Sequence, residues 1–249
     1  MTDPLAPLLQ LDGVAQACDR VRDALAAVHR HPVNLRGWDK TATEASWRAG
    51  RSSAAIDGGS VELTRDGDLD DPVLSGAMRV AQALDGESLN QLVSTWSRAP
   101  LQVVARLQLL AAADLTDDQL ELGRPRAGVD VAARLDLLAQ LLTGGTQVPA
   151  PLLAAVVHGE ILALQPFGAG NGIVARAASR LTCAASGLDP HNLGVPEVTW
   201  FKRLTDYREA SQAFASGDPA GLRDWLMLSC DALEAGAVEA KSIADAARA

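Results

Sequence analysis

The chain has 249 residues, of which 48% are hydrophobic and only 4% aromatic, and its formal net charge at pH 7 is −9. This hydrophobic content suffices for a sizeable core, which alanine, leucine and valine must fill. The negative charge argues against non-specific nucleic-acid binding, because such binding needs clustered lysine and arginine to displace counterions. No apolar stretch approaches the roughly 20 residues that a bilayer span requires, so we predict no membrane span.

Helical patterns recur along the chain, and strand patterns do not. Apolar side chains return every three or four residues, whereas period-two runs of β-branched and aromatic residues are missing over any useful length. Prolines open several of these segments and glycines close them, as is usual for helix ends. The clearest predicted helices span residues 71–86, 100–114, 129–145, 149–164, 172–187, 198–218 and 218–236.

We therefore predict an all-α fold in a single domain that covers residues 1–249. The polar stretch 58–71 is the best candidate for an exposed connection between an N-terminal helical portion and the rest. Residues 237–249 predict a helical tail whose end frays. No repeat of fixed period and no long low-complexity linker divides the chain.

Cysteine and histidine patterns offer no sign of a metal site. The three cysteines are far apart and lack CxxC spacing, which indicates reduced core thiols. The N-terminal residues lack the basic patch and unbroken apolar run of a signal peptide, so we expect a cytoplasmic protein. His29, His31 and His191 show no metal-ligand spacing.

The most informative stretch is a glycine-rich turn between two predicted helices, "LQPFGAGNGIVAR", residues 164–176. Pro166 stops the first helix, and three glycines that follow let the backbone turn freely. Asn171 stands where the N-cap of the second helix is expected. Free amides at a helix N-terminus can bind an anion, although the same loop could be a plain helix–helix connection.

The turn resembles the signature of the Fic (Fido) family, His-Pro-Phe-x-Asp/Glu-Gly-Asn-Gly-Arg-x-x-Arg. The positions that match it in register are Pro166, Phe167, Gly170, Asn171, Gly172 and Arg176. Three positions depart from it, because Gln165 replaces His, Ala169 replaces the acidic residue and Ile173 replaces the first Arg. This degenerate motif covers residues 165–176.

A second resemblance lies about a hundred residues earlier. "SAAIDG", residues 53–58, resembles the family's inhibitory-helix motif Ser/Thr-x-x-x-Glu-Gly/Asn, with Ser53, Asp57 and Gly58 in place and Asp replacing Glu. Downstream, residues 204–218 and 222–233 resemble the Tyr-containing helix and the Trp-containing last core helix of that fold. The resemblance covers about residues 40–235 and implies a Fic-like helical domain with at most a short β-hairpin flap.

The resemblance implies an enzymatic function, and the three substitutions argue against it. Fic enzymes typically transfer AMP from ATP to a hydroxyl of a target protein, with the motif His as general base. Gln165 is essentially non-basic and cannot remove a proton. Ala169 offers no oxygen to Mg²⁺, and Ile173 cannot pair with phosphate as an arginine does.

The retained residues predict a contact between the two motifs. In the family, the second motif Arg meets either the ATP γ-phosphate or the inhibitory Glu. We therefore expect the Asp57 carboxylate to lie within hydrogen-bonding distance of the Arg176 guanidinium. The alternative is that Asp57 caps a helix end and Arg176 is a surface cation.

His158, seven residues before Gln165, is either a replacement base or, as we favour, a core residue.

Three functions remain open from the sequence. The leading hypothesis is a catalytically inactive regulatory or scaffold pseudoenzyme that binds a protein partner. It would need no cofactor, would bind ATP, ADP, AMP or phosphate weakly at best, and would not use Mg²⁺ or another metal. The alternatives are an active AMP or other nucleotide or phosphate-group transferase with altered chemistry, and a structural interaction module; a homo-oligomer is also left open.

We place the flap at residues 143–150 and expect weak target docking there, since this segment ends in proline.

Overall fold

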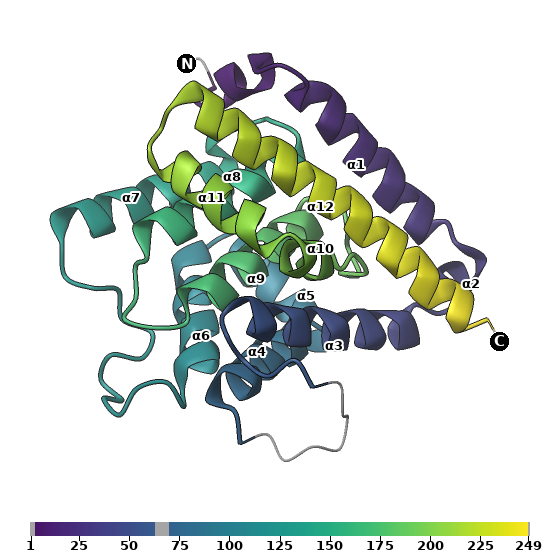
Figure 1. Ribbon diagram of the computed structural model, residues 1–249, viewed down its shortest axis with the longest axis horizontal. Helices are drawn as coiled ribbons and strands as arrows, with labels where there is room; N and C mark the ends of the chain where they lie inside the picture. The colour runs from purple at the N-terminus through teal and green to yellow at the C-terminus, as the bar shows by residue number, and fades with distance from the viewer. Residues whose placement is uncertain (1–2, 63–69, 249) are drawn as a thin grey trace.

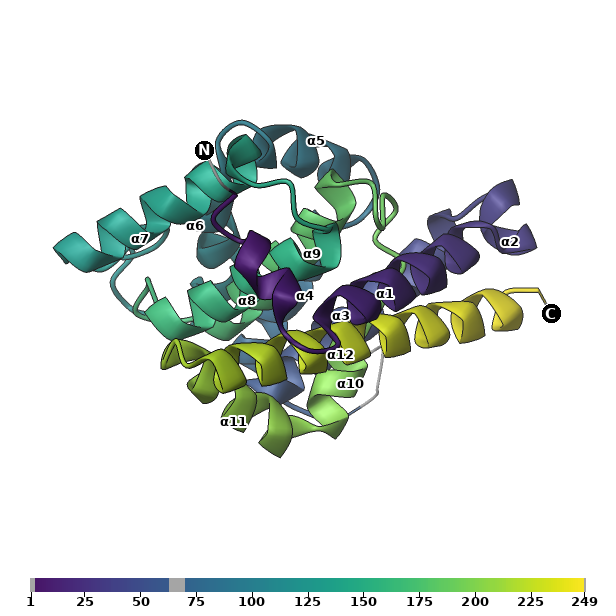
Figure 2. The ribbon, with the colours of Figure 1, turned by 90° about the horizontal axis from the view of Figure 1, so that it is seen from above.

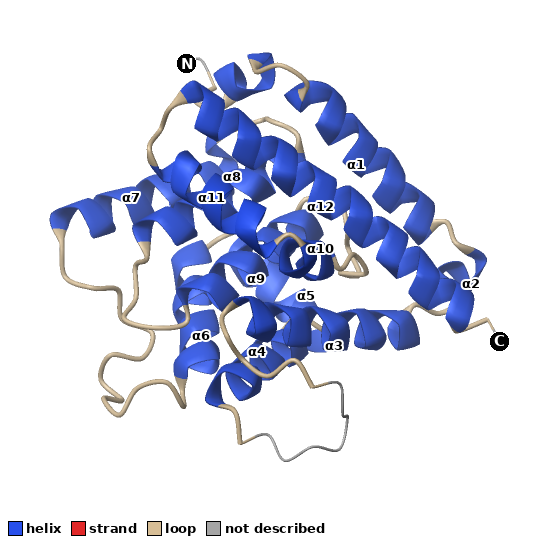
Figure 3. Ribbon diagram, viewed as in Figure 1, coloured by secondary structure: helices blue, strands red, loops and turns tan. Residues whose placement is uncertain are grey.

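The computed structural model describes residues 3–62 and 70–248, and within them every regular element is a helix (Figures 1 and 3). Residues 63–69 of the predicted connection lie outside the described residues. The α-helices are α1 (Val14–His29), α2 (Pro32–Arg36), α3 (Asp39–Ile56), α4 (Pro72–Ala83), α5 (Gly86–Trp96), α6 (Pro100–Ala112), α7 (Val129–Gln140), α8 (Ala150–Leu164), α9 (Asn171–Ala185), α10 (Pro196–Lys202), α11 (Leu204–Ala215) and α12 (Pro219–Ala246). A 3₁₀ turn (Ala6–Gln10) precedes α1, and a π turn (Leu141–Gly145) follows α7.

Helix α9 forms the centre of the fold. All its residues from Ile173 to Ala184 are buried, which its alanine-rich sequence permits because neighbouring helices can approach closely on every side. It packs against α8, the helix just before it in the chain, and also against α3, α4, α5 and α6. The turn between α8 and α9 therefore lies where several core helices meet.

The two terminal helices cover one side of this core. Helix α12 runs for 28 residues, about 42 Å, and lies alongside α1 in both views (Figures 1 and 2). Helix α12 also packs against α8, α10 and α11. Buried Trp225 of α12 and Trp200 of α10 fill this layer. The described helices include none that is long and apolar enough to cross a membrane.

The predicted helices are present, with two differences in the C-terminal half. Residues 198–218 do not form one helix, because the backbone leaves the helical region at Arg203 (φ −112°, ψ 41°) and separates α10 from α11. This break lets Trp200 and Tyr207 both turn towards the core. The predicted tail is continuous with the helix before it, since α12 extends to Ala246. Helix α5, which the sequence analysis does not single out, packs on α6 and α9.

The segment proposed as a flap is not a hairpin. Residues 143–150 comprise the end of the π turn, a short loop and the first residue of α8. Helix α8 is 15 residues long, about 22 Å, so this segment lies at the opposite end of α8 from the glycine-rich turn. The expectation of at most a short hairpin is confirmed for the described residues. Its placement at 143–150 was wrong, because closeness in sequence to α8 does not mean closeness to the end of α8 that carries the motif.

Candidate functional site

The glycine-rich turn is held in shape by its own side chains. Helix α8 ends at Leu164, and Gln165 adopts a left-handed conformation (φ 44°, ψ 62°) before Pro166. Asn171 closes the loop across Phe167: its Oδ1 accepts from the Phe167 amide at 3.0 Å, and its Nδ2 donates to the Phe167 carbonyl at 2.8 Å. Asn171 is therefore the first residue of α9 and not its N-cap, which is Gly170 (φ 77°).

The Asp57 carboxylate lies against the first turn of α9. A Cβ atom added to Gly172 would lie 2.5 Å and 2.6 Å from the two carboxylate oxygens of Asp57. Glycine at this position therefore allows the carboxylate to approach the helix backbone. The N-terminus of a helix carries a partial positive charge, so the carboxylate occupies the place that an external anion would otherwise seek.

Asp57 and Arg176 form the predicted contact. The Arg176 Nη2 lies 2.8 Å from the Asp57 Oδ2, the Arg176 side chain is 1% exposed, and the Asp57 side chain is 28% exposed. Burial acts against the charged guanidinium, but the Asp57 carboxylate outweighs it and raises the pKa of Arg176 above its usual value. Arg176 is thus a buried cation and not the surface cation of the alternative interpretation.

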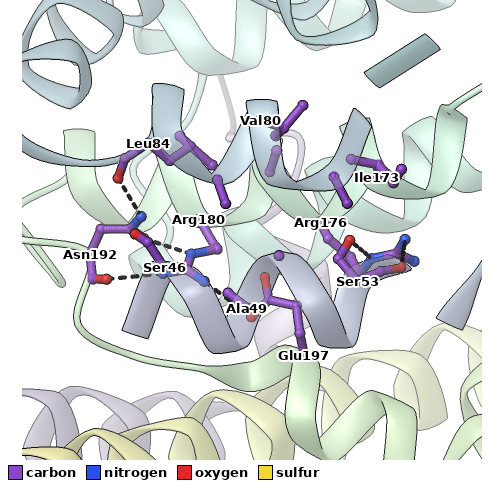
Figure 4. Close-up of a pocket in the computed structure, with 14 residues that line it drawn as sticks. Ser46, Ala49, Ser53, Val80, Leu84, Ile173, Arg176, Arg180, Asn192 and Glu197 are labelled. Atoms are coloured by element: carbon purple, nitrogen blue, oxygen red, sulfur yellow. Dashed lines mark hydrogen bonds and ion pairs between the residues drawn. The ribbon is translucent and has the colours of Figure 1, made fainter. Parts of the chain in front are cut away.

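Ser53 and Tyr207 complete the surroundings of the Arg176 guanidinium. Its Nε donates to the Ser53 hydroxyl at 2.8 Å (Figure 4), and its Nη2 donates to the Ser53 carbonyl at 3.0 Å. Its Nη1 donates to the Tyr207 hydroxyl at 3.3 Å. Ser53 and Asp57 both belong to the C-terminal end of α3, which Gly58 follows in a left-handed conformation (φ 91°). The two distant motifs therefore meet at Arg176. We call this contact of Ser53, Asp57 and Arg176 the brace.

His158 lies in the core and not in a cleft. It is 0% exposed, its Nε2 lies 2.8 Å from the Tyr207 hydroxyl, and its ring meets the edges of Trp200 and Trp225. Burial, and then the charge of Arg176, holds the pKa of His158 well below its usual 6.5. Burial also raises the pKa of Tyr207 to about 12. His158 can reach no substrate hydroxyl in this arrangement, as expected for a core residue.

The three substituted motif positions differ in their surroundings. Gln165 is exposed at the end of α8, and Ala169 is half-buried in the turn. Ile173 is 2% exposed and packs in the hydrophobic core with residues of α4 and α6. Among the described residues, no group of three or more acidic, histidine or cysteine side chains could hold a metal ion.

A loop that the sequence analysis did not assign covers the turn. We call residues 113–128, between α6 and α7, the cover loop. The Arg126 amide donates to the Pro166 carbonyl at 2.7 Å, its Nε donates to the Gln165 carbonyl at 2.8 Å, and its Nη2 donates to the Leu164 carbonyl at 3.0 Å. Arg126 thus stabilises the unpaired carbonyls at the end of α8.

A side chain of α6 links the cover loop to the turn. Gln108 is 2% exposed; it accepts from the Gly123 amide at 2.5 Å and donates to the Ala169 carbonyl at 3.3 Å. The sequence "GRPRAG", residues 123–128, was the only available signal, and it indicates a turn without showing what the turn contacts.

A central α9 preceded by a glycine-rich turn, with an N-terminal helix braced against its first turns, defines a Fic-like helical protein. Solved structures confirm this fold. C. elegans Fic-1 is similar with a TM-score of 0.73 and 16% identity, over 95% of this chain and 74% of that chain. A Fic family protein from Desulfovibrio desulfuricans G20 has a TM-score of 0.68 and 13% identity, over 93% of this chain and 74% of that chain.

A Fic domain containing signaling protein from Bacteroides thetaiotaomicron is also similar, with a TM-score of 0.61 and 12% identity, over 92% of this chain and 98% of that chain. No family model matches the sequence. No curated protein matches it either. The chain therefore has the Fic fold, at sequence identities that establish the fold alone.

Proposed function

We propose that this Fic-fold protein does not carry out conventional AMP transfer and acts through binding, as a regulatory or scaffold pseudoenzyme. The observation that carries the proposal is the position of Asp57. Its carboxylate lies against Gly172 at the N-terminus of α9 and pairs with Arg176 at 2.8 Å. The one motif arginine that remains is thereby already neutralised by the chain itself.

The absence of a general base supports this proposal. Gln165 stands at the position of the catalytic His and has no basic atom, and loss of a general base commonly lowers a rate by about 10²–10⁴-fold. The nearby imidazole of His158 is fully buried and bonded to Tyr207. An altered transferase would therefore need a base from outside this part of the chain.

The charges around the turn support weak nucleotide binding at best. A phosphate at the N-terminus of α9 would meet the Asp57 carboxylate, and the two like charges repel each other. Ile173 adds no positive charge, and Ala169 adds no metal ligand. ATP, ADP, AMP or free phosphate would have to displace Asp57 from Arg176 before it could use the same amides.

The ligand that this proposal favours is a protein partner bound outside the turn. Targets that add as a strand need free backbone groups at the edge they join. In the cover loop, the Gly123 and Arg126 amides are already bonded to Gln108 and Pro166.

The three cysteines are free and buried, which fits a reducing compartment, so we place this binding in the cytoplasm.

The decisive experiment is incubation of the full chain with labelled ATP and cell lysate, followed by intact-mass analysis. We expect no AMP adduct on any protein beyond those in lysate without the chain. A new adduct that depends on the chain would overturn the pseudoenzyme proposal. Calorimetry with ATP, ADP and AMP, with and without Mg²⁺, separates a weak nucleotide binder from a module that binds none. Sub-micromolar, magnesium-dependent ATP binding would contradict the expected weak affinity.

A further inference from the structure

A small cavity lies between α3, α4 and α9, behind the brace. Its volume is about 20 Å³, and every residue that lines it is buried. Figure 4 shows Ser53, Arg176 and Ile173 at one end and Ser46, Arg180 and Asn192 at the other. The wall from α4 is apolar, and the polar groups come from α3, α9 and the segment that follows α9.

Ser46 presents an unsatisfied polar group to this cavity. The residue is 5% exposed, and its hydroxyl has no hydrogen-bond partner among the described residues. Serine hydroxyls can donate one hydrogen bond and accept two. A buried hydroxyl with no partner at all is destabilising, so the position calls for a partner that the protein does not supply.

Arg180 lines the same cavity. It is 5% exposed, and it donates from Nε to the Asn192 side chain at 2.7 Å, from Nη2 to the Asn192 carbonyl at 2.9 Å, and from Nη1 to Glu197 at 3.2 Å. A guanidinium has five N–H groups, so two remain. Ser46 and Arg180 therefore line one space, and each has hydrogen-bonding capacity that its described contacts do not use.

We propose that this cavity is a binding site for one ordered water molecule, which accepts a hydrogen bond from Arg180 and shares another with the Ser46 hydroxyl. A cavity needs about 10–15 Å³ and two to four polar partners to hold a water; this one has a volume of about 20 Å³, and Ser46 and Arg180 are among the polar residues that line it. The water joins α3 to α9 at Ser46, whose side chain makes no direct hydrogen bond to α9.

The consequence concerns the helix that carries Asp57. A water-mediated hydrogen bond is nearly as favourable as a direct one, so the water fixes α3 against α9 two turns and more before the brace. Helix α3 is then held against α9 at two separate polar points, one hydrated and one an ion pair. This inference stands whether or not the site transfers AMP, because it depends only on how α3 is docked.

Thermal melting of two matched variants tests the proposal. Ser46→Ala and Ser229→Ala both remove a buried hydroxyl without a described partner from the middle of a helix, but Ser229 does not line this cavity. The gain in helix propensity is the same for both. We expect Ser46→Ala to melt about 2–4 °C lower than Ser229→Ala, since only Ser46→Ala takes a partner from the water. Equal melting temperatures would overturn the proposal.

A high-resolution crystal structure gives the direct test. We expect a density peak within hydrogen-bonding distance of the Ser46 Oγ and of an Arg180 nitrogen, and we expect this peak to be missing or displaced in Ser46→Ala. Ordered Ser46 and Arg180 side chains around an empty cavity would refute the water site. The pairing of Asp57 with Arg176 should be unchanged in both structures.

Discussion

The brace and the glycine-rich turn are neighbours, yet they differ in how their residues are held. Arg176 is 1% exposed and bonded to Ser53, Asp57 and Tyr207, whereas Gln165 is exposed and only its backbone carbonyl is bonded to Arg126. The brace residues thus have a structural role. No described contact depends on the side chain at position 165. The architecture of the brace therefore does not depend on the side chain at position 165.

The largest effect is expected for Arg176→Met. Methionine fills much of the same space but leaves the Asp57 carboxylate, the Ser53 hydroxyl and the Tyr207 hydroxyl without their shared partner. We expect the free energy of unfolding to fall by about 3–5 kcal/mol, measured by urea denaturation. The control is Arg203→Met, which removes an exposed ion pair with Asp206 and should cost about 0–1 kcal/mol. Equal losses would show that the brace is not a buried ion pair in energetic terms.

Asp57→Asn should have a smaller effect on stability and an opposite effect on anion binding. Because the Asp57 side chain is 28% exposed, we expect a loss of about 1–3 kcal/mol, between the values for exposed and buried pairs. Removing the negative charge should strengthen phosphate binding about tenfold, as read by calorimetry. Asp23→Asn, an exposed charge on α1, is the control. Unchanged phosphate affinity would argue against competition between Asp57 and an anion.

Stability should also depend on pH through His158, next to the brace. The pKa of His158 is well below 6.5 in the folded protein, so only the unfolded chain takes up this proton as pH falls through 6.5. The contribution is fully present above pH 6.5 and decreases below it, by up to about 1.4 kcal/mol per pH unit. Urea denaturation at pH 7, 6 and 5 should show a steeper loss for the natural chain than for His158→Gln. Parallel profiles would contradict the buried neutral imidazole.

Gly172→Ala probes the junction between the two regions. The new methyl group would lie 2.5 Å from the nearer Asp57 oxygen, so the carboxylate must move away from Arg176, and we expect a loss of about 1–2 kcal/mol. In an Asp57→Ala background the same change should instead be neutral or stabilise by about 0.4–1 kcal/mol, because alanine suits a helix better than glycine. Additive effects of the two substitutions would show that residues 57 and 172 do not interact.

The sequence predicted a contact correctly where two motifs each supply one of its two residues. The patterns at 53–58 and 165–176 predicted the meeting of Asp57 and Arg176, since each pattern carries one of the charges. It failed for the cover loop, because the bonds of Arg126 go to backbone carbonyls, which every sequence has. It also misplaced the N-cap of α9: Asn171 has the right side chain for a cap, but it is used across the turn to hold Phe167.

The smallest effect is expected for Gln165→Gly, at the exposed side of the comparison. Gln165 has a left-handed backbone (φ 44°, ψ 62°), which costs a residue with a Cβ roughly 1 kcal/mol, and glycine adopts it freely. Glycine also gains entropy in the unfolded chain, so we expect a net change of about 0–1 kcal/mol towards higher stability. Gln165→Ala keeps the strain and should change stability little. The Arg126 contact is made to the carbonyl of residue 165, so both variants should retain it. A large loss in urea denaturation for either variant would show that the Gln165 side chain stabilises the turn, and the contrast with the brace would not hold.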